Sequence, residues 1–173
     1  MTATLQTDAQ LEQEDTQRGR FLIFTLGEGQ YGIQIRHVKE IIGIQSITSM
    51  PDMPDYIKGV INLRGKIIPV IDVHLRFKQP SMEYTERTCF IVIDTNEISV
   101  GLIVDNVAEV LSISDDDIVP PPPENIGVYN KYVYGFGKIN NKVILLLDCE
   151  KLVTGDEADE LKKSVEGVKN EAF

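Results

Sequence analysis

Side chains that commonly build metal centres and catalytic sites are scarce in this sequence. Its 173 residues include no tryptophan, two histidines and two cysteines. His37 and His74 are not spaced with cysteine or glutamate as a zinc site requires. Cys89 and Cys149 each lie in an apolar run, which favours reduced core thiols over a disulfide. No GxSxG elbow, P-loop or GxGxxG followed by a predicted helix is present. We therefore predict that the protein is not an enzyme and has no catalytic residues, cofactor or metal.

Positive charge is also in short supply. Lysine and arginine number 17 against 27 aspartates and glutamates, which gives a net charge of −10. Nucleic acids and anionic lipids are bound mainly through lysine and arginine contacts to phosphates, so neither is expected as a partner. No apolar run approaches the ~20 residues that a membrane-spanning helix needs. The polar, acidic N-terminus lacks the features of a signal peptide. We expect a cytoplasmic protein without membrane insertion.

Short runs of β-branched and aromatic residues, separated by glycine, asparagine, aspartate and proline, fill residues 20–153. This pattern predicts an all-β fold of small barrels or a sandwich. Residues 37–43 fit either a helix or a continued strand. Residues 1–19 are polar and acidic and are predicted to be a disordered tail. Residues 154–173 contain helix formers and are predicted to form a short C-terminal helix or tail that frays.

The most informative pattern is an internal duplication. A first alignment, which places Phe21 on Phe90, matches FLIFTLGEGQYGIQIRHVKEIIGI with FIVIDTNEISVGLIVDNVAEVLSI, and apolar positions coincide almost throughout. A second alignment, which places Tyr56 on Tyr132, matches YIKGVINLRGKIIPVIDVHLRF with YVYGFGKINNKVILLLDCEKLV. We infer two copies of one β unit, subdomain one over about 20–86 and subdomain two over about 87–153. Each copy is small for an independent domain, so the two are expected to share an interface.

The segment YIKGVINLRGKIIPVIDVHLRF closely resembles the signature of the CheW family, and FLIFTLGEGQYGIQIRHVKEIIG resembles the opening strands of that family. The resemblance covers 20–153 as one CheW-like domain. It implies two five-stranded Src-homology-type β-barrel subdomains around a shared hydrophobic centre, in agreement with the duplication. The chain departs from the family at His74, where arginine is common. Asn140 stands in the second copy where the first copy has Arg64, so we expect the two halves to be functionally unequal.

The resemblance also implies a function. Members of the family are non-catalytic adaptors in bacterial chemotaxis that bridge the cytoplasmic tips of methyl-accepting chemoreceptors and the regulatory domain of the histidine kinase CheA. That kinase domain is itself built like the adaptor. Two alternatives remain open at this stage. The chain could serve a non-chemotactic sensory kinase, or it could belong to a different class, a small-ligand-binding β-barrel protein.

Candidate binding residues follow from the same resemblance and from the duplication. Arg64 is expected to contact a receptor, because a guanidinium offers five donors in a fixed fork that suits carboxylates; the alternative is a solvated turn arginine. Gly59 and Gly135 are expected to serve backbone geometry, and Gly65 to serve either the turn or a partner. The complete receptor set is Ile35, Val38, Glu40, Ile41, Arg64, Val104 and Val107. The kinase set is Met50, Asn62 and Gly65.

Overall fold

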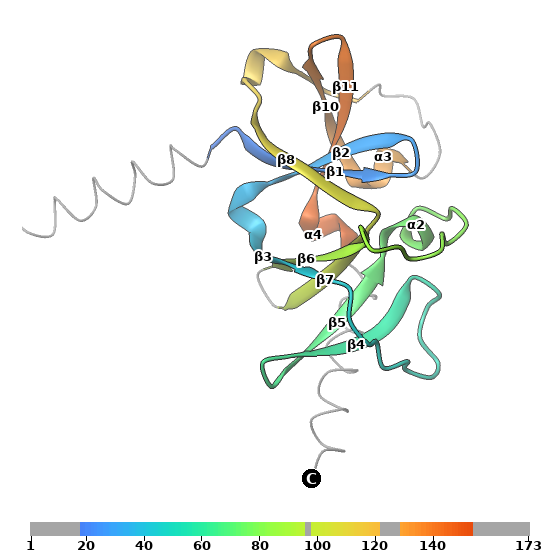
Figure 1. Cartoon of the computed structure of the whole chain (residues 1–173). Helices are drawn as coiled ribbons and strands as arrows, with labels where there is room; N and C mark the ends of the chain where they lie inside the picture. Colours follow the sequence, from blue (N-terminus) through green and yellow to red (C-terminus); the bar gives the residue numbers. More distant parts are fainter. Residues whose placement is uncertain (1–17, 96–97, 122–128, 154–173) are drawn as a thin grey trace, which may run out of the picture.

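Two sheets make up the part of the chain that the computed structural model describes, which comprises residues 18–95, 98–121 and 129–153 (Figure 1). We call the sheet with the order β8-β1-β2-β11-β10-β9 barrel A and the sheet with the order β3-β6-β7-β5-β4 barrel B. The predicted N-terminal tail lies outside the described residues except for its last two positions. The predicted C-terminal helix or tail lies wholly outside them.

The described elements are mostly strands, as the sequence predicts. The strands of barrel A are β1 (Arg20–Leu26), β2 (Gly29–Gln34), β8 (Asn106–Ser112), β9 (Ile118–Val119), β10 (Val133–Ile139) and β11 (Lys142–Leu147). The strands of barrel B are β3 (Val38–Gly43), β4 (Ile57–Leu63), β5 (Lys66–Asp72), β6 (Cys89–Asp94) and β7 (Ser99–Val104). The short helices are η1 (Ile35–His37), α2 (Val73–Arg76), η2 (Asp115–Asp117), α3 (Tyr129–Tyr132) and α4 (Cys149–Leu152). The all-β class is confirmed, and the ambiguous residues after His37 form strand β3.

The two barrels do not coincide with the two halves of the chain. Barrel B is built from residues 38–104, whereas barrel A combines residues 20–34 with residues 106–147. Each barrel therefore contains strands of both sequence copies. The predicted subdomain boundaries, at about 20–86 and 87–153, are wrong as a description of the folded units. The physical reason is the short connection between β7 and β8, where the single residue Asp105 is too little for a hairpin loop, so the chain continues into the other barrel.

The duplication nevertheless governs the strand order. Under the two alignments of the copies, the order of the five main strands of barrel A maps onto that of barrel B. Register pairs correspond in the same way, which shows that the two copies exchange equivalent strands. The corresponding pairs are Leu22–Ile33 with Ile91–Leu102, Phe21–Leu111 with Phe90–Ile42, Gly32–Leu146 with Gly101–Val70, and Gly135–Leu146 with Gly59–Val70.

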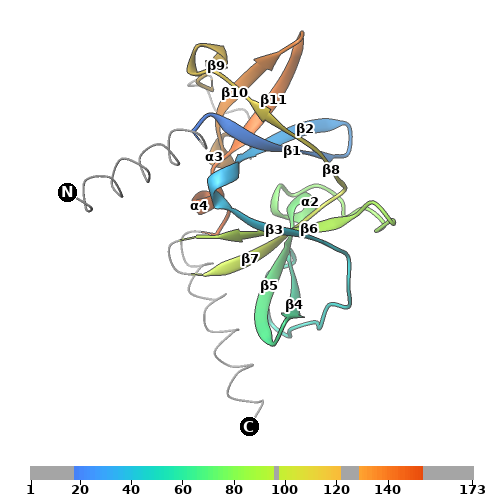
Figure 2. The ribbon, with the colours of Figure 1, turned by 60° about the vertical axis from the view of Figure 1, so that its left-hand side comes forward.

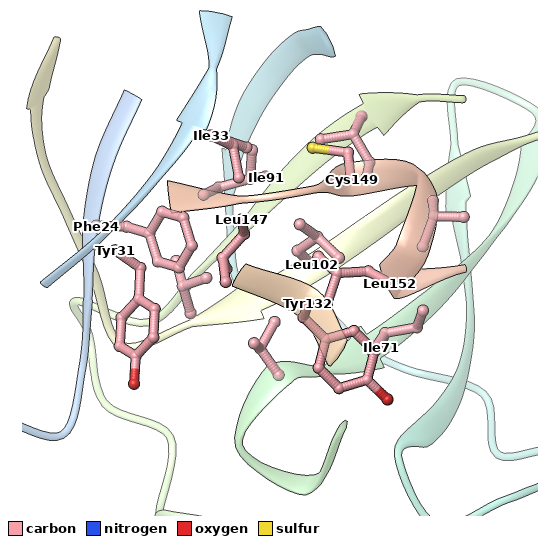
Figure 3. Close-up of a cluster of buried hydrophobic side chains, with 14 of the residues drawn as sticks. Phe24, Tyr31, Ile33, Ile71, Ile91, Leu102, Tyr132, Leu147, Cys149 and Leu152 are labelled. Atoms are coloured by element: carbon pink, nitrogen blue, oxygen red, sulfur yellow. The ribbon is translucent and has the colours of Figure 1, made fainter. Parts of the chain in front are cut away.

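A large hydrophobic core lies where the barrels meet, with α2 and α4 between them (Figure 2). Both barrels contribute to it, and Figure 3 shows side chains of this cluster, including Phe24 of barrel A and Leu102 of barrel B, both fully buried. Each barrel also has a smaller interior cluster of its own, around Ile144 in barrel A and Phe90 in barrel B. Both cysteines are free thiols, and Cys149 belongs to the shared core. The strand exchange thus makes the interface between the barrels the main core of the domain.

Candidate functional site

Arg64 and Glu40 form a two-fold hydrogen-bonded ion pair on the outside of barrel B. The Nη1 atom of Arg64 donates to Oε1 of Glu40 at 3.0 Å, and Nη2 donates to Oε2 at 2.7 Å. Arg64 comes from the turn between β4 and β5, whereas Glu40 lies on the edge strand β3. The sequence analysis placed both residues in the receptor set without predicting that they touch. The structure brings them together in the geometry that best suits a guanidinium and a carboxylate.

The local backbone explains how the turn presents Arg64. Arg64 and Gly65 have φ angles of +52° and +86°, the two positive values that a two-residue type I′ hairpin turn requires. The Gly65 N–H donates to Oδ1 of Asn62 at 2.8 Å, which fixes the turn from within. Gly65 therefore has a structural role in the turn, and so does the side chain of Asn62.

Exposure and charge define what the pair can do. The Arg64 side chain is 73% exposed and the Glu40 side chain 21%. Hydrogen bonding from Arg64 is the main cause that lowers the pKa of Glu40 below its ordinary value, and the same contact raises the pKa of Arg64. Exposed ion pairs contribute little to folding stability because solvent screens them. The pair is therefore expected to add little to the stability of the barrel.

Other members of the predicted receptor set have different surroundings. Ile41 is 44% exposed on β3, whereas Ile35, Val38 and Val107 are half-buried and pack against the shared core. Val104 is fully buried, so the prediction that it contacts a partner is wrong. The first alignment placed Val104 opposite Ile35, but β7 is an interior strand of its sheet whereas Ile35 lies in η1 between the barrels.

Val110 is one of several exposed apolar residues that the sequence analysis did not single out. Val110 on β8 is 40% exposed, and it is the counterpart of Ile41 in the second copy. Both β3 and β8 are edge strands of their sheets. The same alignment that revealed the duplication could have identified Val110, since it maps one exposed edge position onto the other.

A cleft on barrel B contains two residues of the predicted kinase set. It has a volume of about 470 Å³ and lies beside β4. Thr48 exchanges two backbone hydrogen bonds of 2.9 Å with Val60 and so holds the preceding loop against the edge of β4. The residues that line this cleft, which we call the β4 cleft, are Thr48, Ser49, Met50, Pro51, Val60, Ile61, Asn62 and Ile67. The structure thus brings Met50 and Asn62 together, with the Gly65 turn on the same hairpin.

A second cleft, of about 320 Å³, lies between η1 and α4. Burial and the neighbouring Arg36 charge lower the pKa of His37, against the opposite influence of Glu150 and Asp148. Burial raises the pKa of the Cys149 thiol to about 12, so this sulfur is not a nucleophile near neutral pH. The lining residues are Gln34, Arg36, His37, Tyr134, Leu147, Asp148, Cys149 and Glu150. Within the described ranges, no group of three or more histidine, cysteine, aspartate and glutamate side chains is placed to hold a metal ion.

The buried His74 has an acidic partner. Its Nε2 atom lies 2.8 Å from Oδ1 of Asp105, and Oδ2 of Asp105 accepts a hydrogen bond from the Gly27 N–H at 2.7 Å. Gly27 belongs to the turn between β1 and β2 of barrel A, whereas His74 lies in α2. Asp105 therefore joins elements from both barrels at the point where the chain crosses between them, which is a structural role.

Comparisons with known proteins agree with this architecture. The CheW family, described as a CheW-like domain, matches residues 20–157. The chain is 42% identical over 137 residues to a chemotaxis protein CheW of Klebsiella aerogenes, a match that covers 79% of this chain and 82% of that protein. It is 32% identical over 146 residues to a chemotaxis protein CheW of Treponema pallidum, covering 82% of this chain and 86% of that protein.

A solved structure is similar over nearly the same region. The crystal structure of the scaffolding protein TtCheW from Thermoanaerobacter tengcongensis matches with a TM-score of 0.74 and 36% sequence identity. The match covers 80% of this chain and 94% of that one. Among the described residues, no helix is long and apolar enough to cross a membrane.

Proposed function

Because the chain belongs to the CheW family of chemotaxis coupling proteins, we propose that it joins chemoreceptor cytoplasmic tips to the regulatory domain of the histidine kinase CheA. In this role it holds two proteins together in the cytoplasm and needs no catalytic residue, cofactor or metal. The observation that carries the proposal is the exposed Arg64–Glu40 pair, which exists in barrel B alone. At the corresponding positions of barrel A stand Glu109 and Asn140, and an asparagine cannot form an ion pair with the glutamate.

The receptor is proposed to contact the pair and the adjoining edge of β3. Glu40 accepts two hydrogen bonds from a guanidinium that has five N–H donors, so Arg64 retains donors for a carboxylate of the partner. Ile41 is exposed on the same strand but on the face opposite Glu40, because successive side chains of a strand alternate, so it supplies apolar area on the other face of the β3 edge. Receptor tips are helical, and an apolar surface with a few polar groups that fix register is suited to a helix.

The kinase domain is proposed to occupy the β4 cleft. Met50 and Asn62 line it, and the cleft is bordered by Val60, Ile61 and Ile67 of the same hairpin. A flexible, polarisable methionine adapts to the shape of a partner side chain. Since this cleft and the Arg64 turn lie on one hairpin, the two partners would meet barrel B close to each other.

Calorimetric titration with a receptor fragment and with the CheA regulatory domain tests the proposal. Arg64→Ala is expected to weaken binding of the receptor fragment about thirtyfold, since truncating a charged group at a desolvated contact costs on the order of 2 kcal/mol. Arg64→Lys is expected to recover only part of the loss, because an ammonium cannot form the fork. Met50→Ala is expected to weaken binding of the kinase domain instead.

Asn140→Ala is the matched control at the equivalent turn of barrel A, and it is expected to leave both affinities unchanged. Thermal melts of each variant check that a loss of binding does not come from a loss of fold. Equal losses from the two turn variants would contradict the proposal. A pull-down from a bacterial lysate separates the chemotactic role from the alternative of a non-chemotactic sensory kinase, since the two predict different co-eluting kinases.

A further inference from the structure

The hairpin that carries Arg64 extends beyond the parallel ladder of barrel B. Strand β5 pairs with β7 through Val70, Ile71 and Asp72. The next residue toward the turn is Pro69, which has no N–H to continue that ladder. From there to the turn, β5 pairs with β4. Figures 1 and 2 both show the β4–β5 turn at the end of barrel B farthest from barrel A. Side chains must therefore fix the end of this hairpin relative to the rest of the barrel.

Lys66, two residues after Arg64, makes such a side-chain contact. Its Nζ atom donates to the hydroxyl oxygen of Ser99 at 3.3 Å, and the Ser99 hydroxyl donates to Oδ1 of Asp94. Ser99 is only 9% exposed and is the cross-strand partner of Asp94 in the β6–β7 hairpin. The three residues form a continuous chain of hydrogen bonds in which a cation and a carboxylate share one hydroxyl. This chain ties β5 to β6 and β7 beyond the end of the backbone ladder.

We propose that the Lys66–Ser99–Asp94 chain positions Arg64 for its contact with Glu40. The chain attaches β5 to β7 and, through Asp94, to β6, while the ion pair attaches the turn to β3 through Glu40. Strands β6 and β3 are neighbours in the sheet, so both contacts attach the hairpin to adjacent strands. The consequence of the Lys66–Ser99–Asp94 chain for partner binding rests on the proposed function. Its effect on the Arg64–Glu40 contact does not.

Barrel A provides an internal comparison. Its equivalent lysine is Lys142, but Gln30 and Thr25 stand where barrel B has Ser99 and Asp94, so no carboxylate is present to complete the chain. Leu145 replaces Pro69 and pairs with Tyr31, which extends the parallel ladder of barrel A toward its turn. The interrupted ladder and the Lys66–Ser99–Asp94 chain thus occur together in the barrel that has an arginine at its turn.

The test measures the pKa of the Glu40 carboxyl by NMR titration of the free protein. Ser99→Ala leaves the net charge unchanged and is expected to raise this pKa toward the ordinary value, because Arg64 is held less firmly. Asp94→Ala gives a sharper result. Loss of a nearby negative charge by itself would lower the pKa of Glu40, so a rise in this variant reports a loosened Arg64 contact. Gln30→Ala, the change in barrel A that matches Ser99→Ala, is expected to have no effect.

Affinity for a receptor fragment is measured on the same proteins. Ser99→Ala and Asp94→Ala are expected to weaken binding about two- to fivefold, the range that a single exposed polar contact contributes. An unchanged Glu40 pKa in both variants overturns the proposal. A raised Glu40 pKa combined with normal binding by Arg64→Ala supports the positioning role and overturns the proposed function. If Ser99→Ala fails to fold, Asp94→Ala decides, since Asp94 is exposed.

Discussion

The guanidinium of Arg76 stacks on the ring of Tyr56, with its carbon 4.3 Å from the ring centroid. The same carbon lies 4.8 Å from the ring centroid of Tyr132, the counterpart of Tyr56 in the second copy. The Nε atom donates to the backbone oxygen of Leu152 at 3.0 Å. Arg76 is only 5% exposed, so a single buried cation contacts both copies of the repeated tyrosine where the barrels meet.

Arg76→Met is expected to lower the free energy of unfolding by about 2–3 kcal/mol, through loss of desolvated cation–π contacts and a charged hydrogen bond. Arg76→Lys is expected to restore part of the loss, because it keeps the charge without the planar stack. Urea denaturation of both variants checks this. If Arg76→Met were as stable as the natural protein, the cost of burying the guanidinium would equal the gain from its contacts.

Glycine substitutions are expected to differ sharply between positions. A Cβ atom on Gly59, where φ is +148°, would lie 2.0 Å from the backbone oxygen of Thr48, so Gly59→Ala is expected to cost at least about 3 kcal/mol. On Gly135, the nearest atom would be a methyl carbon of Ile118 at 2.9 Å, and this side chain can move, so we expect about 1 kcal/mol. Gly43→Ala, with no atom within 4 Å, is the control. Thermal melts that rank the three variants differently would contradict this account.

The pH dependence of the Arg64–Glu40 pair has a definite sign. Because Arg64 holds the pKa of Glu40 below its ordinary value, the contribution of the pair is present above the ordinary pKa of glutamate. It is lost as the pH falls through the lowered value. Arg64→Ala is expected to return the pKa of Glu40 to the ordinary range, as measured by NMR titration. Asn140→Ala should leave it unchanged, and identical Glu40 titrations in all three proteins would exclude the contact in solution.

The two thiols are expected to react slowly with alkylating reagents in the folded protein. With a pKa of about 12, Cys149 is almost entirely protonated near neutral pH, and it is buried in the shared core. Burial also raises the pKa of Cys89, but this residue is partly exposed. Mass spectrometry after iodoacetamide treatment should therefore show Cys89 modified before Cys149, and both rapidly modified in urea. Faster modification of Cys149 under native conditions would show that the shared core opens locally.

The duplication and the all-β class could be predicted from the sequence because both depend on local patterns. Runs of β-branched residues indicate strands wherever they occur, and two alignments match the copies position by position. The equivalence of Tyr56 with Tyr132 and of Gly59 with Gly135 follows from the alignment alone. The resemblance to CheW was confirmed for the same reason, since its motif lies in one continuous segment.

Strand partners were decided only by the tertiary structure. Two similar copies offer each strand two equivalent neighbours, and an alignment cannot distinguish pairing within a copy from pairing between copies. The short link at Asp105 favours exchange, because a single residue cannot reverse the chain into a hairpin. The exchange makes β7 an interior strand and buries Val104, which the sequence analysis had placed at the surface.

The contact at the candidate site was likewise decided only by the tertiary structure. The sequence identified Glu40 and Arg64 separately, at distant positions, by their places in a family pattern. Their contact depends on the closure of barrel B, which brings the β4–β5 turn to the edge strand β3. Side-chain contacts of this kind are fixed by where strands lie in space, whereas the sequence by itself determines which residue types are available to make them.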